Sequence, residues 1–424
     1  MIGLVDGNNF FVSCERVIDP KLNGRPVAVL SNNDGCCVAM SPEFKALGIK
    51  RGTPYFQLKD REYPKGELVF LSSNYELYGD LSRRIIAVLR ERAVEVEQYS
   101  IDEAFIRPPA AELGRLMEYG KSVRSQVLRW VGIPCGVGFA KTKTLAKIAN
   151  HIGKKTREGV FVLPDDPTEI LAKLPVDEVW GVGRRLPLKL RAERIFTARD
   201  LRDAPDEVLR TVGGVTLVRT AMELRGVSCN QDRAYEADPD TITCSRSFGE
   251  RITTQDALME SIASFTAQAA VKLRRHGMLA GGCNVYAQTA VPGMFDSRGG
   301  LDSSFAGFTV VFPGPTDATN VMLGAIREKI GSLFVPGTKY RKSGIVFFGL
   351  EKAGGVYQAD LFAPAEKREK SRLYEAIDAL NSKFGKGKVF SAAEGVGDQT
   401  WAMKRSKVSK RATTNWSELL TARA

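Results

Sequence analysis

The chain has 424 residues, of which 43% are hydrophobic and 26% are charged, an ordinary composition with enough apolar residues for several cores. At ~150 residues per domain, this length excludes one ordinary domain and predicts roughly three. Sixty-one Lys and Arg residues against 49 Asp and Glu residues give a net charge of +12, which favours a polyanionic partner, nucleic acid before an anionic membrane. A basic enzyme without such a partner is the alternative.

The numbers of cysteines and histidines indicate the redox compartment of the protein and the kinds of catalytic site that it can form. The seven cysteines are odd in number and lack C-x-x-C spacing, which predicts free thiols in a reducing compartment. With only two histidines, a zinc site or a general base built on histidine is disfavoured. Residues 1–6 lack the basic segment of a signal peptide, and no apolar run reaches the ~18 residues of a membrane span, so we expect an intracellular chain without a membrane partner.

Apolar periodicity predicts alternating strands and helices in the first half of the chain. The expected elements are strands at 1–6 and 27–31, a turn at 32–35, a short helix at 42–47, an amphipathic helix at 74–92, a strand at 94–101, a helix at 112–131, a strand at 136–139 and a helix at 142–152. Short helices separated by glycines follow at 175–226, and then a polar, acidic linker at 229–240.

The second half predicts a compact strand–helix–strand–strand–helix–strand unit. Its elements are expected at 241–250, 255–275, 281–289, 304–312, 317–333 and 343–350. This order is the split βαβ, ferredoxin-like plan. The pattern weakens from about residue 351, and the tail carries a basic cluster at Lys404, Arg405, Lys407, Lys410 and Arg411.

Three carboxylates stand at the ends of two predicted strands, Asp6 on the first and the adjacent Asp102 and Glu103 on the strand that follows the 74–92 helix. Hard divalent cations take oxygen ligands, and two neighbouring Mg²⁺ ions are the usual machinery of phosphoryl transfer. In a regular strand Asp102 and Glu103 would point to opposite faces, so joint metal binding requires the chain to turn at these residues. An exposed acidic pair on a hairpin is the alternative.

Seven segments in order carry a family resemblance: 6–11, 30–36, 72–78, 99–105, 142–150, 179–185 and 244–251. On these segments, which span nearly the whole chain, the sequence resembles the Y-family translesion DNA polymerases, most closely the UmuC type. The resemblance implies an α+β multidomain, right-hand polymerase with a ferredoxin-like palm, small fingers, a helical thumb with a helix–hairpin–helix and a ferredoxin-like (βαββαβ) little finger. The implied domains are palm 1–10 and 74–165, fingers 11–73, thumb 166–229, linker 230–240, little finger 241–350 and a partner-binding tail 351–424.

The resemblance also implies the catalytic and metal-binding residues. Asp6, Asp102 and Glu103 would be catalytic and would bind two Mg²⁺ ions, with the Gly7 carbonyl as a further ligand. One ion would lower the pKa of the primer 3′-hydroxyl, and the other would neutralise charge on the triphosphate. Relatives usually carry a larger residue at position 7.

The implied nucleotide-binding residues are Asn8, Phe10, Phe11, Lys45 and Lys154, with Phe11 as the steric gate against a 2′-hydroxyl. From the residues alone, two core aromatics at a strand end are the favoured interpretation. Many relatives have Arg at position 45, where this chain has Lys, a point charge in place of a bidentate fork. On the 142–152 helix, Lys143 and Lys147 share a face that is either functional or simply solvated.

The DNA contacts implied by the resemblance lie in the thumb and little finger. Gly181 and Gly183 would let backbone N–H groups approach a phosphate, and Pro187 is tolerable only in the first turn of the second helix. Arg246 and Arg251, with Arg274 and Arg275, are candidate contacts to the duplex backbone, which position DNA without reading its sequence.

The implied protein partners are contacted through the tail. Gln358, Leu361 and Phe362 resemble the pentapeptide with which bacterial polymerases bind the sliding clamp, and residues 401–420 resemble the region that contacts the processed UmuD dimer and the RecA filament. A disordered, basic DNA-binding tail is the alternative.

The resulting hypothesis is an error-prone translesion DNA polymerase of the SOS response, acting on primer-template DNA and dNTP in the bacterial cytoplasm at the nucleoid. A catalytically silent DNA-binding homologue and a two-metal nuclease are the competing classes.

Overall fold

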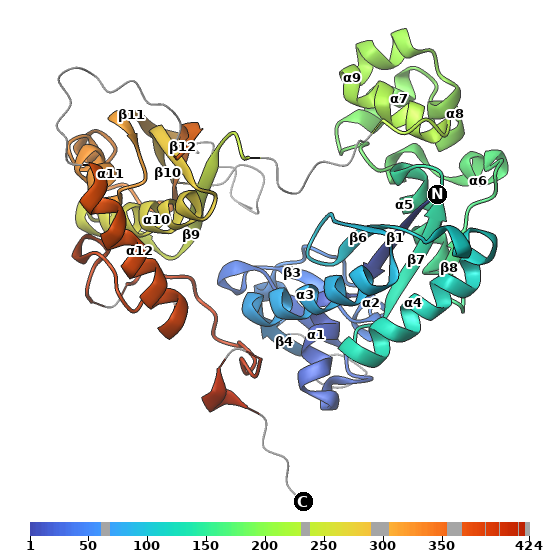
Figure 1. Cartoon of the computed structure of the whole chain (residues 1–424), viewed down its shortest axis with the longest axis horizontal. Helices are drawn as coiled ribbons and strands as arrows, with labels where there is room; N and C mark the ends of the chain where they lie inside the picture. Colours follow the sequence, from blue (N-terminus) through green and yellow to red (C-terminus); the bar gives the residue numbers. More distant parts are fainter. Residues whose placement is uncertain are drawn as a thin grey trace, which may run out of the picture. The chain divides into compact units, whose positions relative to one another are not determined.

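The computed structural model describes residues 1–60, 68–229, 238–289, 305–353, 367–385, 387–397, 399–413 and 415–419, except for the side chains of 367–371. The chain forms two compact units, Met1–Ala237 with Ser406–Ala424, and Asp238–Arg405 (Figure 1). All seven cysteines are free thiols, as predicted. In the described part of the chain, no helix combines the length and apolar character that crossing a membrane requires.

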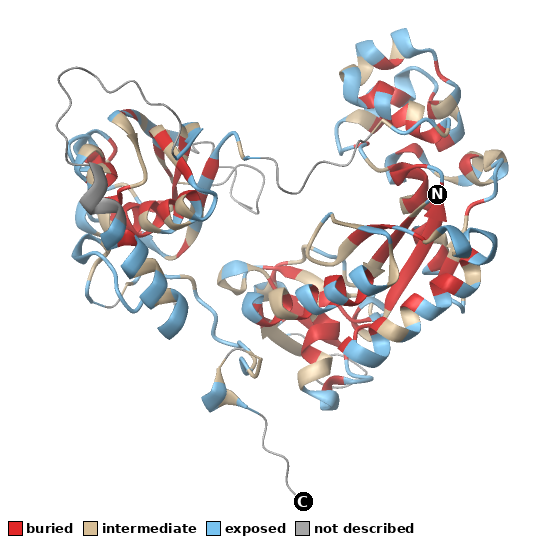
Figure 2. Ribbon diagram, viewed as in Figure 1, coloured by how far each residue is buried: buried red, intermediate tan, exposed pale blue. Residues whose placement is uncertain are grey.

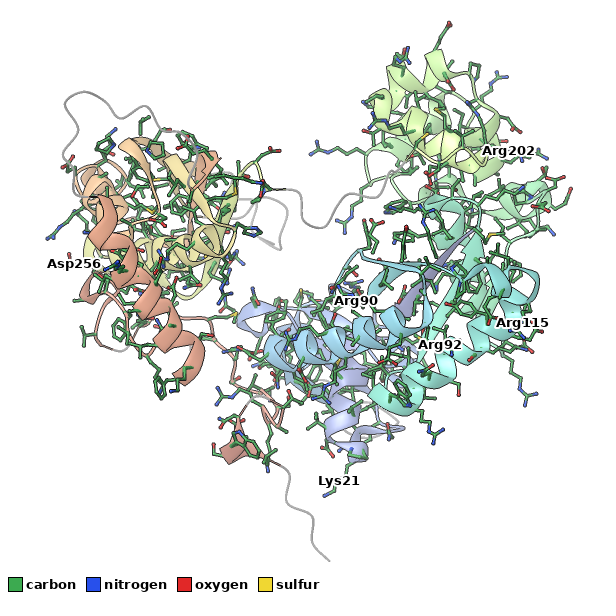
Figure 3. The ribbon with its side chains drawn as sticks, viewed as in Figure 1. Lys21, Arg90, Arg92, Arg115, Arg202 and Asp256 are labelled. Carbon is green, nitrogen blue, oxygen red and sulfur yellow. The ribbon has the colours of Figure 1, made fainter. Side chains whose placement is uncertain are left out.

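A five-stranded sheet organises the first unit. Its strands, in spatial order, are β5 (Glu95–Gln98), β6 (Glu103–Arg107), β1 (Ile2–Gly7), β7 (Cys135–Ala140) and β8 (Val160–Val162). With α3 (Tyr75–Arg92) after β1 and α4 (Leu116–Val131) after β6, the first four strands have the ferredoxin-like order predicted for a palm. Arg92 at the end of α3 donates to the Ser122 hydroxyl on α4 (Figure 3).

Alternation along β1 sends its side chains into two different cores. Val5 is buried with residues of α1 (Phe10–Ile18), α3 and α4, whereas Leu4 is buried with residues of α5 (Lys143–Gly153) and of the thumb helices. Figure 2 shows β1 as mostly buried. Because side chains two residues apart share a face, Asp6 lies on the same side of the sheet as Leu4, toward α5.

The three-stranded sheet of the fingers region has the order β3 (Cys37–Met40), β2 (Val27–Leu30) and β4 (Val69–Ser72), with the short helix α2 (Pro42–Lys45) beside it. The sequence pattern did not predict strands β3, β4, β6 and β8 or helix α1. Helix α1 begins at Phe10, directly after Asn9 turns the chain in the left-handed conformation, with a φ of 47°. Asn tolerates this conformation, so the aromatic pair opens a helix where it was expected at a strand end.

The thumb region contains α6 (Thr168–Lys173), α7 (Leu186–Ala192), α8 (Ala198–Asp203) and α9 (Asp206–Leu224). Pro187 lies in the first turn of α7, as its missing N–H demands. On α8, Arg202 bonds its neighbour Asp203 and the Thr168 hydroxyl of α6, which ties the two helices together (Figure 3).

The second unit has the predicted βαββαβ element order: β9 (Ile242–Ile252), α10 (Gln255–Arg275), β10 (Met278–Gln288), β11 (Phe305–Thr316), α11 (Thr319–Arg327) and β12 (Tyr340–Lys352). The four strands pair in the order β11-β10-β12-β9. Trp401 is 7% exposed and packs edge-on against Phe265 of α10, so the chain between α12 (Lys367–Phe384) and residue 405 is anchored in this core.

Candidate active site

The strand that carries the adjacent carboxylates ends in a tight hairpin. Strand β5 stops at Gln98 and β6 begins at Glu103, so the chain reverses over residues 99–102. Ser100 holds the turn, since its hydroxyl donates to Asp102 Oδ1 over 2.7 Å and accepts from the Glu103 amide over 3.0 Å. The reversal that joint metal binding requires is therefore present.

Asp6 lies directly opposite Glu103 in the antiparallel pairing of β1 with β6. The Gly7 amide donates to the Asp102 carbonyl over 2.8 Å, which fixes the hairpin against the end of β1. Opposite residues of an antiparallel pair project from the same face of the sheet. The three acidic residues thus meet at one corner of the palm sheet, although metal binding by them stays a prediction.

A row of lysines on α5 crosses this face of the sheet and pairs with one carboxylate from each of three strands. Lys143 pairs with Glu97 of β5, and Lys147 lies 2.9 Å from Glu103 Oε2 of β6. Lys154, directly after the helix, lies 2.6 Å from Asp6 Oδ2 of β1.

The burial of these lysines contradicts the alternative that Lys143 and Lys147 lie on a solvated helix face. Lys143 is 3% exposed, and the Lys147 side chain is 15% exposed. The Lys147 ammonium also lies 4.5 Å from the ring centre of Tyr99 and 5.2 Å from that of Trp180, which are cation–π distances. Periodicity placed these lysines on one helix face but could not show that the face meets the sheet.

The electrostatics of the corner favour a bound cation. Burial raises the pKa of Asp6 to about 6; Lys154 opposes the rise, whereas the carboxylates of Glu103 and Asp102 add to it. Within the described residues, no three Asp, Glu, His or Cys side chains already converge as a metal cage. Mg²⁺ needs only one or two carboxylates when substrate phosphates complete its shell, so the oxygen donors present fit such an ion.

A cleft of about 290 Å³ opens at this corner between the palm and the thumb. Its polar lining includes Asp6, Glu103, Lys147, Lys154 and Trp180. Trp180, which lies in the 179–185 segment, was not predicted to reach the carboxylates. An anionic substrate that enters this cleft would meet both the carboxylates and the lysines.

The candidate gate Phe11 lies on α1, with its ring stacked on Tyr78 of α3 at 4.5 Å between centres and 13° between planes. Phe10, by contrast, is 3% exposed in the palm core, so its contact with a nucleotide stays a prediction. A Cβ at Gly7 would lie 3.0 Å from the Phe10 ring. Glycine at this position is therefore matched to the close approach of Phe10.

Lys45 of α2 belongs to a second group of cations. Its ammonium donates to the Asn9 side chain. Burial lowers the pKa of Lys45, and the positive charges of Lys154 and Arg51 lower it further. Arg51 and Asn9 were missed by the sequence analysis. The Asn8 Oδ1 atom is buried with no hydrogen-bond partner among the described residues, and its contact with a nucleotide stays a prediction.

The remaining predicted residues belong to other segments of the chain. Gly181 has a φ of +92°, which suits a tight turn, and a Cβ added at Gly183 would meet no atom within 4 Å. Arg246 and Arg251 are exposed on β9 of the second unit. Gln358, Leu361 and Phe362 lie outside the described residues.

Arg274 has a structural role that corrects its assignment as a DNA contact. Its guanidinium makes two hydrogen bonds to Asp378 of α12, at 2.7 and 3.0 Å, and its side chain is 10% exposed. It also lies 4.9 Å from the ring centre of Tyr374. Arg274 therefore holds α12 against α10.

Three family models match the chain. The impB/mucB/samB family matches residues 5–151, and the impB/mucB/samB family C-terminal domain matches residues 239–361. A Domain of unknown function (DUF4113) matches residues 371–422.

Similar proteins cover nearly the whole chain. It is 40% identical to Protein UmuC of Salmonella typhimurium over 99% of both sequences, and 38% identical to Protein ImpB of Salmonella typhimurium over the full length of both. It is 27% identical to DNA polymerase IV 1 of Bacillus subtilis over 90% of both.

Solved structures of similar fold include a Y-family DNA polymerase chimera of Dbh and Dpo4, with a TM-score of 0.64 and 20% identity over 83% of this chain and 100% of that one. An insertion ternary complex of Dbh DNA polymerase has a TM-score of 0.53 and 21% identity over 82% of this chain and 98% of that one. At such identities the similarity shows the fold, and it confirms the expected α+β right-hand architecture. With two family models matched in order and 40% identity over 99% of its length, the chain belongs to the impB/mucB/samB family, the UmuC type of Y-family polymerase that its sequence resembles.

Proposed function

We propose that this protein is a template-directed, error-prone translesion DNA polymerase, which transfers a nucleotide from a dNTP to a primer 3′-hydroxyl during SOS-type DNA damage tolerance. The observation that carries the proposal is the pairing of Asp6 with Glu103 on adjacent strands, with Asp102 in the hairpin beside them. Carboxylates and lysines at the edge of one cleft suit a nucleoside triphosphate with its divalent metal.

Asp6, Asp102, Glu103 and the Gly7 carbonyl would hold the metal, which we propose to be two Mg²⁺ ions. Bound there, the ions supply a lowered pKa at the attacking hydroxyl and neutralisation of the leaving pyrophosphate. Hard oxygen donors at this corner support that choice over a softer metal.

The residues around the carboxylates receive the nucleotide. Lys45 and Lys154 bind the triphosphate, with Asn8 as a further polar contact. Phe11, backed by the Tyr78 ring, excludes a 2′-hydroxyl. The positive potential of Lys45, Lys154 and Arg51 supports this placement of the phosphates.

DNA and protein partners complete the proposal. Gly181, Gly183, Arg246 and Arg251 hold the duplex backbone. A processed UmuD-type dimer, the RecA filament and, through Gln358, Leu361 and Phe362, the sliding clamp deliver the enzyme to damaged DNA in the bacterial cytoplasm at the nucleoid. The domain boundaries that the resemblance implies are part of this proposal.

Primer extension on undamaged and abasic templates, with and without a UmuD-type dimer and a RecA filament, tests the function. The unmodified chain should lengthen a labelled primer, and Asp102→Asn should not. Shortened primer would favour the nuclease, and intact primer under every condition would favour a catalytically silent DNA-binding protein.

A further inference from the structure

The C-terminal residues 406–419, here called the tail strap, belong to the first unit and bind at the end of β4 and the start of α3. The Ser72 amide at the end of β4 donates to the Lys407 carbonyl over 3.0 Å, and the Lys407 amide donates to the Ser72 hydroxyl over 2.9 Å. Ser72 and Val408 form a parallel bridge. The Ser406 amide and hydroxyl both donate to Asp34 Oδ2, at 3.1 and 3.0 Å.

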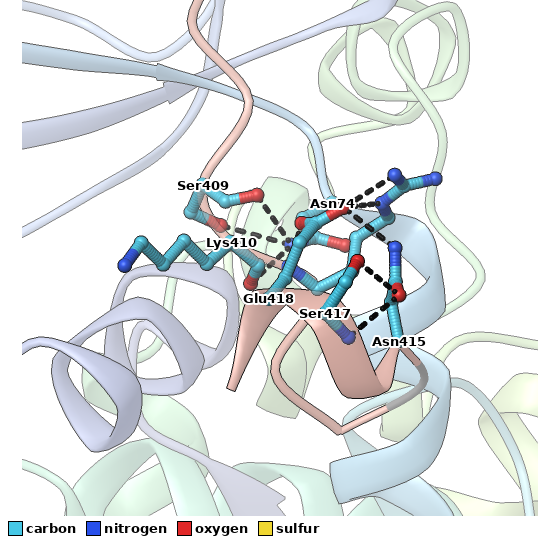
Figure 4. Close-up of polar contacts among 7 residues, drawn as sticks. Asn74, Ser409, Lys410, Asn415, Ser417 and Glu418 are labelled. Carbon is cyan, nitrogen blue, oxygen red and sulfur yellow. Dashed lines mark hydrogen bonds and ion pairs between the residues drawn. The ribbon is translucent and has the colours of Figure 1, made fainter. Parts of the chain in front are cut away.

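The strap supplies the partner of a buried amide at the start of α3. Asn74 is 0% exposed, and its Oδ1 accepts from the Leu77 amide over 3.3 Å, which caps the helix. Its Nδ2 donates to the Ser409 hydroxyl over 2.9 Å, and the carbonyls of Ser409 and Lys410 lie at 3.4 Å (Figure 4). The strap thus supplies the shortest hydrogen bond of this donor, and a buried donor left without a partner is costly.

A second set of contacts keeps the far end of the strap folded. The Arg411 amide donates to Glu418 Oε2 over 2.7 Å, and the Arg411 guanidinium also pairs with Glu418. Asn415 donates to Glu418 Oε1 over 2.8 Å and accepts from the Ser417 amide over 3.1 Å (Figure 4). Most of the strap stays exposed, including Trp416 at 89%, so polar contacts at Asn74, Ser72 and Asp34 hold it more than apolar burial does.

The same end of α3 supports the gate. One turn after Asn74, the Tyr78 amide donates to the Asn74 carbonyl over 3.0 Å. The Tyr78 ring stacks on Phe11 at 4.5 Å, and its hydroxyl donates to Glu15, a carboxylate of the gate's own helix that is 1% exposed. Burial raises the pKa of Glu15, and polar interactions with Tyr78 and Ser409 oppose the rise.

We propose that the tail strap is a positioning element for sugar selection: through Ser409 and Asn74 it fixes the start of α3 and so holds Tyr78 against Phe11. The inference rests on the proposed polymerase function and on Phe11 as its gate. Ser409 and Asn74 are positioning residues, because neither is assigned a contact with the nucleotide. The chain thus couples the state of its C-terminus to the discrimination between dNTP and rNTP.

The variants Ser409→Ala and Asn74→Ser test the coupling, the second because serine keeps a cap acceptor and removes the amide donor. A neutral hydrogen bond shifts a two-state equilibrium by a factor of about two to ten. We expect a ~2- to 5-fold lower ratio of dNTP to rNTP incorporation in both variants, with kcat/KM for the dNTP unchanged. Ser409→Thr, which keeps the hydroxyl, should restore the ratio, and Trp416→Ala should not alter it.

Two further measurements separate the outcomes. In a Phe11→Ala background, Ser409→Ala should have no additional effect on sugar selection, because the side chain that it positions is absent. Fluorotyrosine at Tyr78 should give a ¹⁹F resonance that moves in Ser409→Ala and not in Ser409→Thr, a readout that needs no polymerase activity. If all variants extend a primer and sugar selection is unchanged, the role of the strap is overturned and the proposed polymerase function is not. If the unmodified chain never extends a primer, the proposed function itself is overturned.

Discussion

Replacing Lys147 with methionine removes one ammonium from the lysine row and keeps an unbranched side chain beside Tyr99 and Trp180. The ammonium makes hydrogen bonds of 3.0 and 2.9 Å to the two oxygens of Glu103, and the paired side chains are 15% and 21% exposed. The substitution therefore leaves Glu103 as an unpaired, largely buried carboxylate next to Asp6.

The expected loss of stability follows from these contacts. A hydrogen bond to a charged group contributes ~1.5–3 kcal/mol, and breaking a fully buried ion pair costs about 3–5 kcal/mol. Water reaches part of both side chains and recovers some of this energy. We expect Lys147→Met to lower the free energy of unfolding by ~2 kcal/mol, part of it from the lost cation–π contacts.

Urea denaturation followed by tryptophan fluorescence measures this loss. Lys141→Met is the matched control, because its ammonium lies 2.8 Å from Asp165 but the two side chains are 51% and 88% exposed. Such a surface pair contributes at most ~1 kcal/mol. Added Mg²⁺ should stabilise Lys147→Met more than the unmodified chain, since a bound cation replaces the lost ammonium. Equal unfolding midpoints for both variants and the unmodified chain would refute the reasoning.

Three other predictions follow from the same structure. Phe11→Leu should raise the incorporation of rNTP relative to dNTP in single-nucleotide extension, and an unchanged ratio would remove the gate from Phe11. In the metal-free chain, the pKa of Asp6 is about 6 against an ordinary 3.8. The protonated Asp6 carboxyl therefore contributes fully to the free energy of unfolding below pH 3.8, and this contribution is lost as the pH rises through about 6. Urea titrations of Asp6→Asn should lack this pH dependence. Arg274→Ala should free α12 and speed proteolysis within Lys367–Phe384, with the exposed Arg275→Ala as the control; equal cleavage rates would contradict the anchoring role of Arg274.

The sequence was sufficient to predict the parts of the site that are formed by residues close together in the chain. Two adjacent carboxylates after a strand required a reversal of the chain, and the Ser100 hairpin provides it. The strand that carries Asp6 and the helix that carries Lys147 and ends just before Lys154 were also evident from their periodicity.

What the sequence could not supply depends on contacts between distant segments. The lysine row was compatible with solvent until the sheet placed Glu97, Glu103 and Asp6 opposite it. Helix α1 depends on the left-handed Asn9, a conformation that is rare for residues other than glycine. The strap on Asn74 links residues 335 positions apart, beyond the reach of any local pattern.

The tail strap also changes the connectivity of the molecule. The chain leaves the first unit before Asp238 and rejoins it at Ser406, so a docked strap makes the second unit an insertion that is tethered at both ends. A doubly tethered unit has fewer accessible placements than a singly tethered one, and this sets its effective concentration at any surface of the first unit. If Arg246 and Arg251 contact DNA as proposed, release of the strap would therefore change how often they meet a duplex bound to the first unit, with no residue of either unit altered.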